Sequence, residues 1–134
     1  LGRPVGSAFM EKRRSEGVVS GEAFVGDVAG KTAVIVDDLV SGGATLARAA
    51  AACRSRGAKR ILAAASHGLF NGAAASVLAE SALEKLLVTN SVPPFRLPPA
   101  LLDGRVEVLD TAPLFAEAIG RLHQGGSLVE LLGG

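Results

Sequence analysis

The sequence predicts a single α/β domain built on a mainly parallel sheet, and three observations lead to this expectation. The 134 residues suit one domain. Hydrophobic residues make up 49% of the chain, with no Trp or Tyr, so Ala, Val and Leu must form the core. Finally, β-branched runs alternate with alanine-rich segments of helical length. Such alternation produces right-handed βαβ units, which place ligands at the carboxyl ends of parallel strands.

The first quarter of the chain is expected to contain short strands on either side of one loop. Strands are predicted over 4–10 and 23–28, because both segments are apolar. Between them, the polar segment 11–21 contains Gly and Ser and is predicted to be an exposed, mobile loop. Segment 32–36 (TAVIV) is a β-branched run typical of a buried parallel strand.

Helices and strands then alternate along the rest of the chain. A helix is predicted over 44–56, because Gly57 stands at the usual C-terminal position and Arg54 and Arg56 complement the helix dipole. The remaining predicted elements are strands over 60–65, 85–89 and 106–109, helices over 73–81 and 112–123, a proline-rich connector over 93–99, and a terminal helical turn over 127–132.

A pair of carboxylates followed by a glycine-rich turn is the strongest chemical signal in the sequence. The residues are Asp37, Asp38, Ser41, Gly42, Gly43, Ala44 and Thr45. Backbone N–H groups of such a turn, together with a helix N-terminus, bind phosphate. The carboxylates can accept hydrogen bonds from vicinal hydroxyls and help to hold Mg²⁺. This combination describes a phosphorylated pentose, although the same residues could simply end a strand and cap a helix.

Residues 37–45 are similar to the phosphoribosyl pyrophosphate-binding loop of type I phosphoribosyltransferases and of the synthetases that share their fold. Other segments resemble one family in particular, the ribose-phosphate pyrophosphokinases or phosphoribosyl pyrophosphate synthetases. These segments are EKRR at 11–14, VGDVAGKT at 25–32, ASHGLF at 65–70, LVTNS at 87–91 and APLFAEAI at 112–119. The resemblance covers nearly the whole chain in the family's order, which makes it more specific than the loop alone.

The resemblance implies a type I phosphoribosyltransferase-like three-layer domain over residues 1–134, equivalent to the carboxy-terminal half of a synthetase. It also implies the family's reaction, in which the diphosphoryl group of ATP passes to ribose 5-phosphate with Mg²⁺, giving phosphoribosyl pyrophosphate and AMP. Lys12 and Arg14 are implied to stabilise charge on the transferring group. Asp37 and Asp38 are implied to hold the ribose hydroxyls and the metal, and residues 41–45 the 5-phosphate.

The loop departs from the family's usual pattern at two positions. Gly42 lacks the hydroxyl that normally touches the 5-phosphate. Ala44 replaces a glycine, which costs on the order of 1 kcal/mol if the backbone there requires a positive φ. These changes keep open a non-catalytic, synthetase-like regulatory subunit. The other alternative is a phosphoribosyltransferase that consumes phosphoribosyl pyrophosphate, but it leaves the Lys-Arg-Arg sequence unexplained.

Three further features are expected to be structural. Segment 26–32 (GDVAGKT) resembles a nucleotide-binding P-loop, but it is one residue too short and leads into a strand, so a turn is predicted. His67 follows a predicted strand, where we favour a structural hydrogen bond over a role in ligand binding. His123 near a helix end is expected to contact the last carbonyls of that helix.

The net charge and the apolar runs lead to expectations about binding partners and cellular location. A net charge of +1 gives no electrostatic reason to expect nucleic acid or an anionic membrane. We expect a cytoplasmic protein, because neither a membrane-spanning run nor a signal peptide is recognisable.

The chain opens with Leu1 rather than Met, which indicates a fragment or processed product. By resemblance, the amino-terminal half supplies much of the ATP site, so the chain alone is expected to be inactive. The family also builds its site between subunits, which implies a homo-oligomer.

Overall fold

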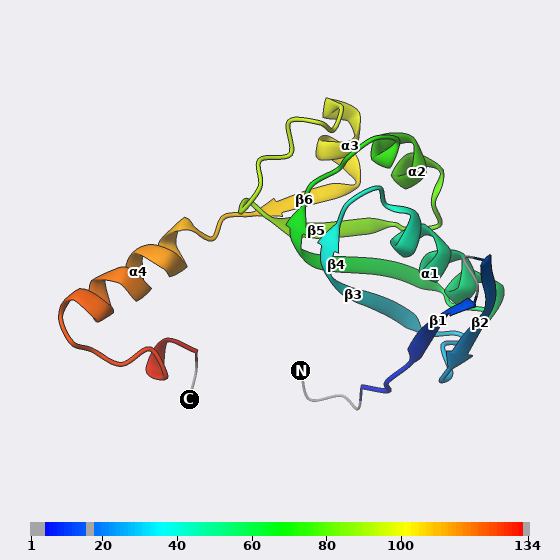
Figure 1. The fold of residues 1–134 in the computed structure, drawn as a ribbon, viewed down its shortest axis with the longest axis horizontal. Coiled ribbons are helices and arrows are strands. Elements are labelled where there is room, and N and C mark those ends of the chain that lie inside the picture. The colour runs from blue at the N-terminus through cyan, green and yellow to red at the C-terminus, as the bar shows by residue number, and fades with distance from the viewer. Residues whose placement is uncertain (1–4, 16–17, 133–134) are drawn as a thin grey trace.

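A computed structural model describes residues 5–15 and 18–132, with the backbone alone described over 11–15 and 18–23 (Figure 1). Its elements are β1 (Phe9–Ser15), β2 (Val18–Val25), β3 (Thr32–Val40), α1 (Ala44–Ser55), β4 (Arg60–Gly68), α2 (Ala74–Glu80), β5 (Lys85–Thr89), α3 (Pro99–Gly104), β6 (Val106–Leu109), α4 (Ala112–His123) and the 3₁₀ turn Glu130–Leu132. Four strands form a parallel sheet in the order β3-β4-β5-β6, and β1 and β2 form a separate antiparallel pair. The predicted α/β fold with a mainly parallel sheet is confirmed.

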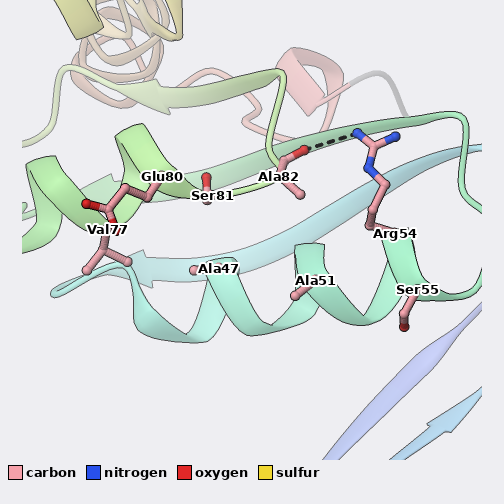
Figure 2. Close-up of a pocket in the computed structure, with 8 residues that line it drawn as sticks. All are labelled: Ala47, Ala51, Arg54, Ser55, Val77, Glu80, Ser81 and Ala82. Atoms are coloured by element: carbon pink, nitrogen blue, oxygen red, sulfur yellow. Dashed lines mark hydrogen bonds between the residues drawn. The ribbon is translucent and has the colours of Figure 1, made fainter.

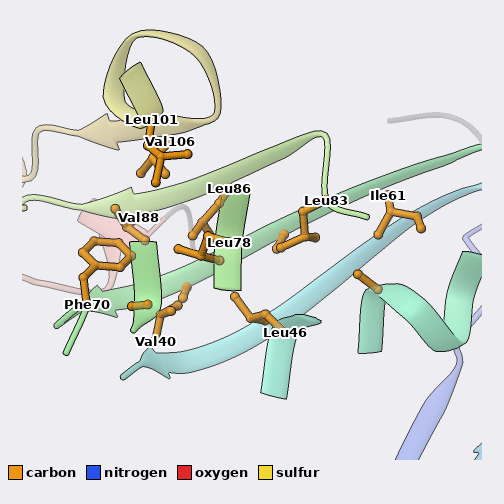
Figure 3. Close-up of a cluster of buried hydrophobic side chains, with 14 of the residues drawn as sticks. Val40, Leu46, Ile61, Phe70, Leu78, Leu83, Leu86, Val88, Leu101 and Val106 are labelled. Atoms are coloured by element: carbon orange, nitrogen blue, oxygen red, sulfur yellow. The ribbon is translucent and has the colours of Figure 1, made fainter. Parts of the chain in front are cut away.

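The core lies between one face of the parallel sheet and helices α1, α2 and α3 (Figure 3). Along β4, every second residue from Ile61 to Ala65 is buried, as the two-residue period of a strand requires. Ile61 and Val88 of the sheet and Leu46 of α1 are among the largest fully buried side chains. The small residue Ala50 is also completely buried, because α1 packs closely on the strands.

The opposite face of the sheet is open in the described part of the chain. Val34 and Val36 of β3 are 58% and 79% exposed, and Leu109 of β6 is 45% exposed. The expectation that 32–36 forms a buried strand was therefore wrong for one of its faces. The physical reason is that β3 is an edge strand and only one face of the sheet carries helices. The described residues form two of the three expected layers.

The predicted mobile loop over 11–21 was also wrong, because most of this segment belongs to a β-hairpin. Apolar residues at the two ends of the segment pair across it, with Phe9 opposite Val25 and Met10 opposite Phe24. A polar composition between these pairs is compatible with a two-stranded ladder, since the backbone hydrogen bonds do not depend on the side chains. Phe24 lies beneath the guanidinium of Arg56, whose Cζ is 4.4 Å from the ring centre.

Helix α3 was not predicted: the proline-rich connector was predicted over 93–99, and residues 100–104 were assigned to no element. Pro98 is extended and Pro99 occupies the first turn of the helix, where its missing N–H costs nothing. Leu101 anchors the short helix by packing into the core. The predicted connector is non-helical over 93–98, and the helix begins at its last proline.

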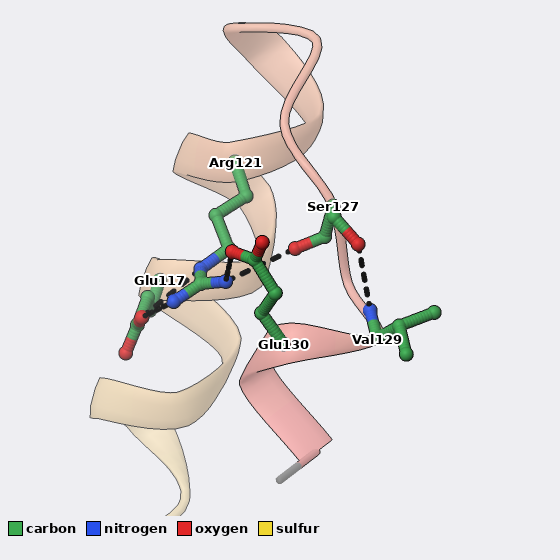
Figure 4. Close-up of polar contacts among 5 residues, drawn as sticks. All are labelled: Glu117, Arg121, Ser127, Val129 and Glu130. Carbon is green, nitrogen blue, oxygen red and sulfur yellow. Dashed lines mark hydrogen bonds and ion pairs between the residues drawn. The ribbon is translucent and has the colours of Figure 1, made fainter. Parts of the chain in front are cut away.

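Helix α4 lies apart from the parallel sheet, and none of its residues is buried (Figure 1). Its start is held by Asn90, whose side chain donates to Asp110 at 2.6 Å and accepts from the backbone N–H of Thr111 at 3.0 Å. At its other end, Arg121 pairs with Glu117 at 2.7 Å and donates to the carbonyl of Ser127 at 3.1 Å (Figure 4). Across the described residues, no helix has the length and apolar character needed to cross a membrane.

Candidate functional site

The carboxylate pair lies inside β3 and not at its end. The strand runs to Val40, because its parallel register with β4 continues as far as Val40 opposite Gly68. Asp37 is half-buried and Asp38 is exposed. The Asp37 carboxylate accepts a hydrogen bond of 2.9 Å from the backbone N–H of Asp38. The two carboxylates therefore stand near the carboxyl edge of the sheet, about two residues before the turn begins.

The turn between β3 and α1 has the backbone form that a phosphate site requires. Gly43 is buried, has φ 77° and is the N-cap of α1. A Cβ on Gly43 would make only an ordinary contact of 3.4 Å with Cγ of Leu78 on α2, so the positive φ is what favours glycine there. No side chain caps the helix. The first N–H groups of α1, starting with Ala44 and Thr45, are thus left for an external acceptor such as phosphate.

The two departures from the family's loop are tolerated by the backbone. Among the described residues, Phe70 is the only non-glycine with a positive φ, so Ala44 carries no such strain. Its position as the first residue of α1 explains this, because helical residues have negative φ. At Gly42 an added Cβ would meet nothing within 4 Å. A side chain at position 42 therefore has room to stand beside the turn.

His67 belongs to a polar cluster at the carboxyl edge of β4 and β5. Its Nδ1 lies 2.8 Å from the hydroxyl of Ser91. The Thr89 hydroxyl donates to the carbonyl of Ser66 at 2.6 Å and lies 2.8 Å from Ser91. A structural hydrogen bond for His67 was predicted, and one is present. The side chains around His67 were not predicted, although the polar residues that end the segment LVTNS were a signal of such hydrogen-bond partners.

One hollow on the described surface borders the carboxylate of Asp37. It has a volume of 250 Å³ and is lined by Val36, Asp37, Ala64, Ala65, Ser66, Leu87, Val88, Thr89 and Leu109. A larger one, of 560 Å³, lies between α1 and α2 and includes no residue of 37–45 (Figure 2). Arg54 crosses its edge to the carbonyl of Ala82 at 3.4 Å, which is a structural contact. Of these two hollows, only the smaller one is lined by a predicted site residue, Asp37.

The P-loop-like segment 26–32 is a closed turn, as predicted. The Asp27 carboxylate accepts a hydrogen bond from the backbone N–H of Ala29 at 3.0 Å and forms an ion pair with the Lys31 ammonium at 2.7 Å. The hydrogen bond from the Lys31 ammonium lowers the pKa of the Asp27 carboxyl below its usual range. Because Lys31 is engaged within the turn and leads into β3, it does not face a phosphate as a P-loop lysine does.

The predicted catalytic cations lie on the β1–β2 hairpin. Lys12 and Arg14 belong to β1, where the pairing register with β2 shifts between them, and their side chains are outside the described part of the molecule. In the described residues, no three His, Cys, Asp or Glu side chains gather into a metal site. Asp37 and Asp38 still suit Mg²⁺, which is commonly bound by one or two carboxylates together with substrate phosphates and water.

Several known proteins are similar to this chain in sequence, and one is similar in structure. The family described as "Phosphoribosyl synthetase-associated domain" matches residues 18–133. The chain is 42% identical to a ribose-phosphate pyrophosphokinase of Aquifex aeolicus, over 80% of this chain and 33% of that protein. It is 40% identical to one of Caldanaerobacter subterraneus, over 92% of this chain and 39% of that protein. The crystal structure of a phosphoribosylpyrophosphate synthetase from Mycobacterium smegmatis superposes with a TM-score of 0.74 at 36% identity, covering 89% of this chain and 37% of that one. The chain thus spans roughly a third to two fifths of these relatives' length.

Proposed function

This chain belongs to the ribose-phosphate pyrophosphokinase family, and from that premise we propose that it holds the ribose 5-phosphate of a synthetase. The parent enzyme would transfer the diphosphoryl group of ATP to the 1-hydroxyl of the sugar, giving phosphoribosyl pyrophosphate and AMP. One observation carries the proposal: the Asp37-Asp38 pair stands next to a left-handed glycine turn that leads into an uncapped helix. The two alternatives, a phosphoribosyltransferase and a regulatory subunit, are not favoured, because the relatives share the name pyrophosphokinase.

The 5-phosphate would sit against the turn 41–43 and the first turn of α1. The N–H groups of Ala44 and Thr45 and the hydroxyls of Ser41 and Thr45 are donors suited to phosphate oxygens. The positive end of the α1 dipole would add to the attraction of the anion. Gly43 contributes by its conformation, since its left-handed backbone turns the chain from β3 into the helix.

The carboxylates would bind the other end of the sugar. Asp37 and Asp38 can accept hydrogen bonds from the vicinal ribose hydroxyls, and both can contribute oxygen ligands to Mg²⁺. When bound, Mg²⁺ supplies charge neutralisation for the diphosphoryl oxygens. The protein's own contribution is to hold the hydroxyl end and the phosphate end of one sugar at a fixed separation, so that its 1-hydroxyl is correctly oriented.

Lys12 and Arg14 would act on the group that is transferred. Phosphoryl transfer proceeds through a loose transition state that needs positioning and charge compensation more than covalent help. Two cations on a hairpin are suited to that role. ATP as co-substrate, assembly into a homo-oligomer and a cytoplasmic location stay predictions of the same proposal.

The sugar site is tested by replacing Asp38. We expect Asp38→Ala to weaken ribose 5-phosphate binding in the presence of Mg²⁺ by at least about tenfold, or about 1.4 kcal/mol, because it removes one of the two carboxylates available to the ribose hydroxyls and the metal. Isothermal titration calorimetry measures this directly. Asp103→Ala is the matched control, since Asp103 is an exposed carboxylate on α3. Equal affinity of Asp38→Ala and the unmodified chain would remove Asp38 from the site.

A side chain added at position 42 is expected to increase the affinity for ribose 5-phosphate. We expect Gly42→Thr to strengthen ribose 5-phosphate binding by roughly threefold to tenfold, because a hydrogen bond to a charged group contributes about 1.5–3 kcal/mol before ordering costs. The open space around Gly42 admits the side chain. Gly43→Thr is the paired control and should weaken binding, since the φ of 77° disfavours a β-branched residue there. Weaker binding by Gly42→Thr would contradict the assignment of the phosphate to this turn.

A further inference from the structure

The phosphate-binding turn is attached to the loop that follows β4. The backbone N–H groups of Leu69 and Phe70 both donate to the carbonyl of Val40, at 2.9 and 3.2 Å. The backbone N–H of Asn71 donates to the carbonyl of Ser41 at 3.0 Å. The Asn71 side-chain amide also reaches the Ser41 hydroxyl, at 3.5 Å. The loop therefore holds the last residue of β3 and the first residue of the turn by four contacts.

This loop is held in an unfavourable backbone conformation by its packing. Phe70 has φ 51°, in the left-handed region that non-glycine residues rarely occupy, yet its side chain is only 2% exposed. A Cβ on Gly68 would lie 2.5 Å from the Phe70 ring, so the ring occupies the space that this glycine leaves. Arg96 adds a hydrogen bond of 3.1 Å to the carbonyl of Leu69. A strained residue retained this way indicates that the surroundings require one loop position.

We propose that Asn71 is a positioning residue for ribose 5-phosphate, acting through Ser41. The inference rests on the proposed function and adds a residue to it. Because the Asn71 amide donates to the Ser41 oxygen, the Ser41 hydroxyl hydrogen is left to donate to a phosphate oxygen. The backbone bond from Asn71 holds the same residue from its carbonyl side. Asn71 thus sets the direction of one phosphate donor without touching the ligand.

A double-mutant cycle tests this coupling in the 134-residue chain. We expect Asn71→Ala to weaken binding of ribose 5-phosphate and of inorganic phosphate by the same factor, roughly threefold to tenfold. We expect Ser41→Ala to have at least as large an effect. The double variant should then bind no more weakly than Ser41→Ala, because Asn71 has no route to the phosphate once the hydroxyl is gone. Calorimetry gives the affinities, and thermal unfolding shows whether each variant is folded.

Gly68→Ala provides an independent variant. Its new methyl group must displace the Phe70 ring, which carries Asn71 away from Ser41, so phosphate affinity should fall by about tenfold or more. Gly104→Ala is the matched control, since a Cβ there meets nothing within 4 Å and Gly104 ends α3. If Gly68→Ala does not fold, the double-mutant cycle between Asn71 and Ser41 is by itself the test of the positioning role.

The possible outcomes separate this inference from the function on which it rests. Additive losses in the Asn71 and Ser41 cycle, or unchanged affinity in Asn71→Ala, overturn the positioning role while leaving the sugar site in place. Failure of the unmodified chain to bind either ribose 5-phosphate or inorganic phosphate overturns the proposed function and this inference together. Equal losses for both ligands, with no further loss in the double variant, support the role of Asn71.

Discussion

Replacing Lys12 by Ala in a complete synthetase that carries this sequence is expected to lower kcat by roughly 10²- to 10³-fold. The KM for ribose 5-phosphate should stay within about threefold. The reason is that a cation placed on the transferring group interacts with charge that develops in the transition state, whereas we propose that the turn after β3 holds the sugar. A loss confined to kcat is the kinetic result of removing such an interaction. Steady-state measurement of product formation at varied ribose 5-phosphate distinguishes the two parameters.

A chimera provides the enzyme for this experiment. The segment of the Caldanaerobacter subterraneus relative that aligns with this chain can be exchanged for it, because the two are 40% identical over 92% of this chain. Lys59→Ala is the matched control, since Lys59 is an exposed lysine beside the amino end of β4, away from the carboxyl edge of the sheet. A Lys12→Ala chimera that keeps its kcat and loses affinity for the sugar would make Lys12 a ground-state binding residue.

The 134-residue chain by itself is expected to form no phosphoribosyl pyrophosphate or AMP from ATP and ribose 5-phosphate. Transfer requires ATP, metal and sugar to be held in line, and that positioning supplies much of the rate. The chain spans 33–39% of the relatives quoted above. Weak binding of the sugar phosphate without turnover is the expected combination.

Chromatography of the products, with Mg²⁺ and excess substrates, measures this outcome. The active chimera serves as the positive control, because it contains the same sugar site together with the rest of a synthetase. Turnover that follows the isolated chain through purification, and that disappears in Lys12→Ala, would show that these residues assemble a complete active site.

Much of the fold was predictable from local pattern. The runs TAVIV and KLLVT are β-branched or apolar over strand length. Helix α1 ends at Ser55, two residues before Gly57, because glycine readily adopts the φ of 83° found there and so turns the chain away from the helix. The carboxylate pair and the glycine turn were recognisable for the same reason, since all seven residues are close in sequence. The assignment of ribose 5-phosphate to them stays a prediction.

Other features depend on contacts between segments distant in sequence. The openness of the β3 face follows from its edge position, which a β-branched run does not reveal, and the hairpin of 9–25 depends on pairing between its two ends. The attachment of Ser41 to Asn71 joins residues 30 positions apart. A composition or a period describes one segment at a time, so the sequence alone determined the strands of the parallel sheet, most of the helices and the glycine turn after β3. The tertiary structure decided which faces are covered and which loop supports the turn, because both depend on which neighbours come together in space.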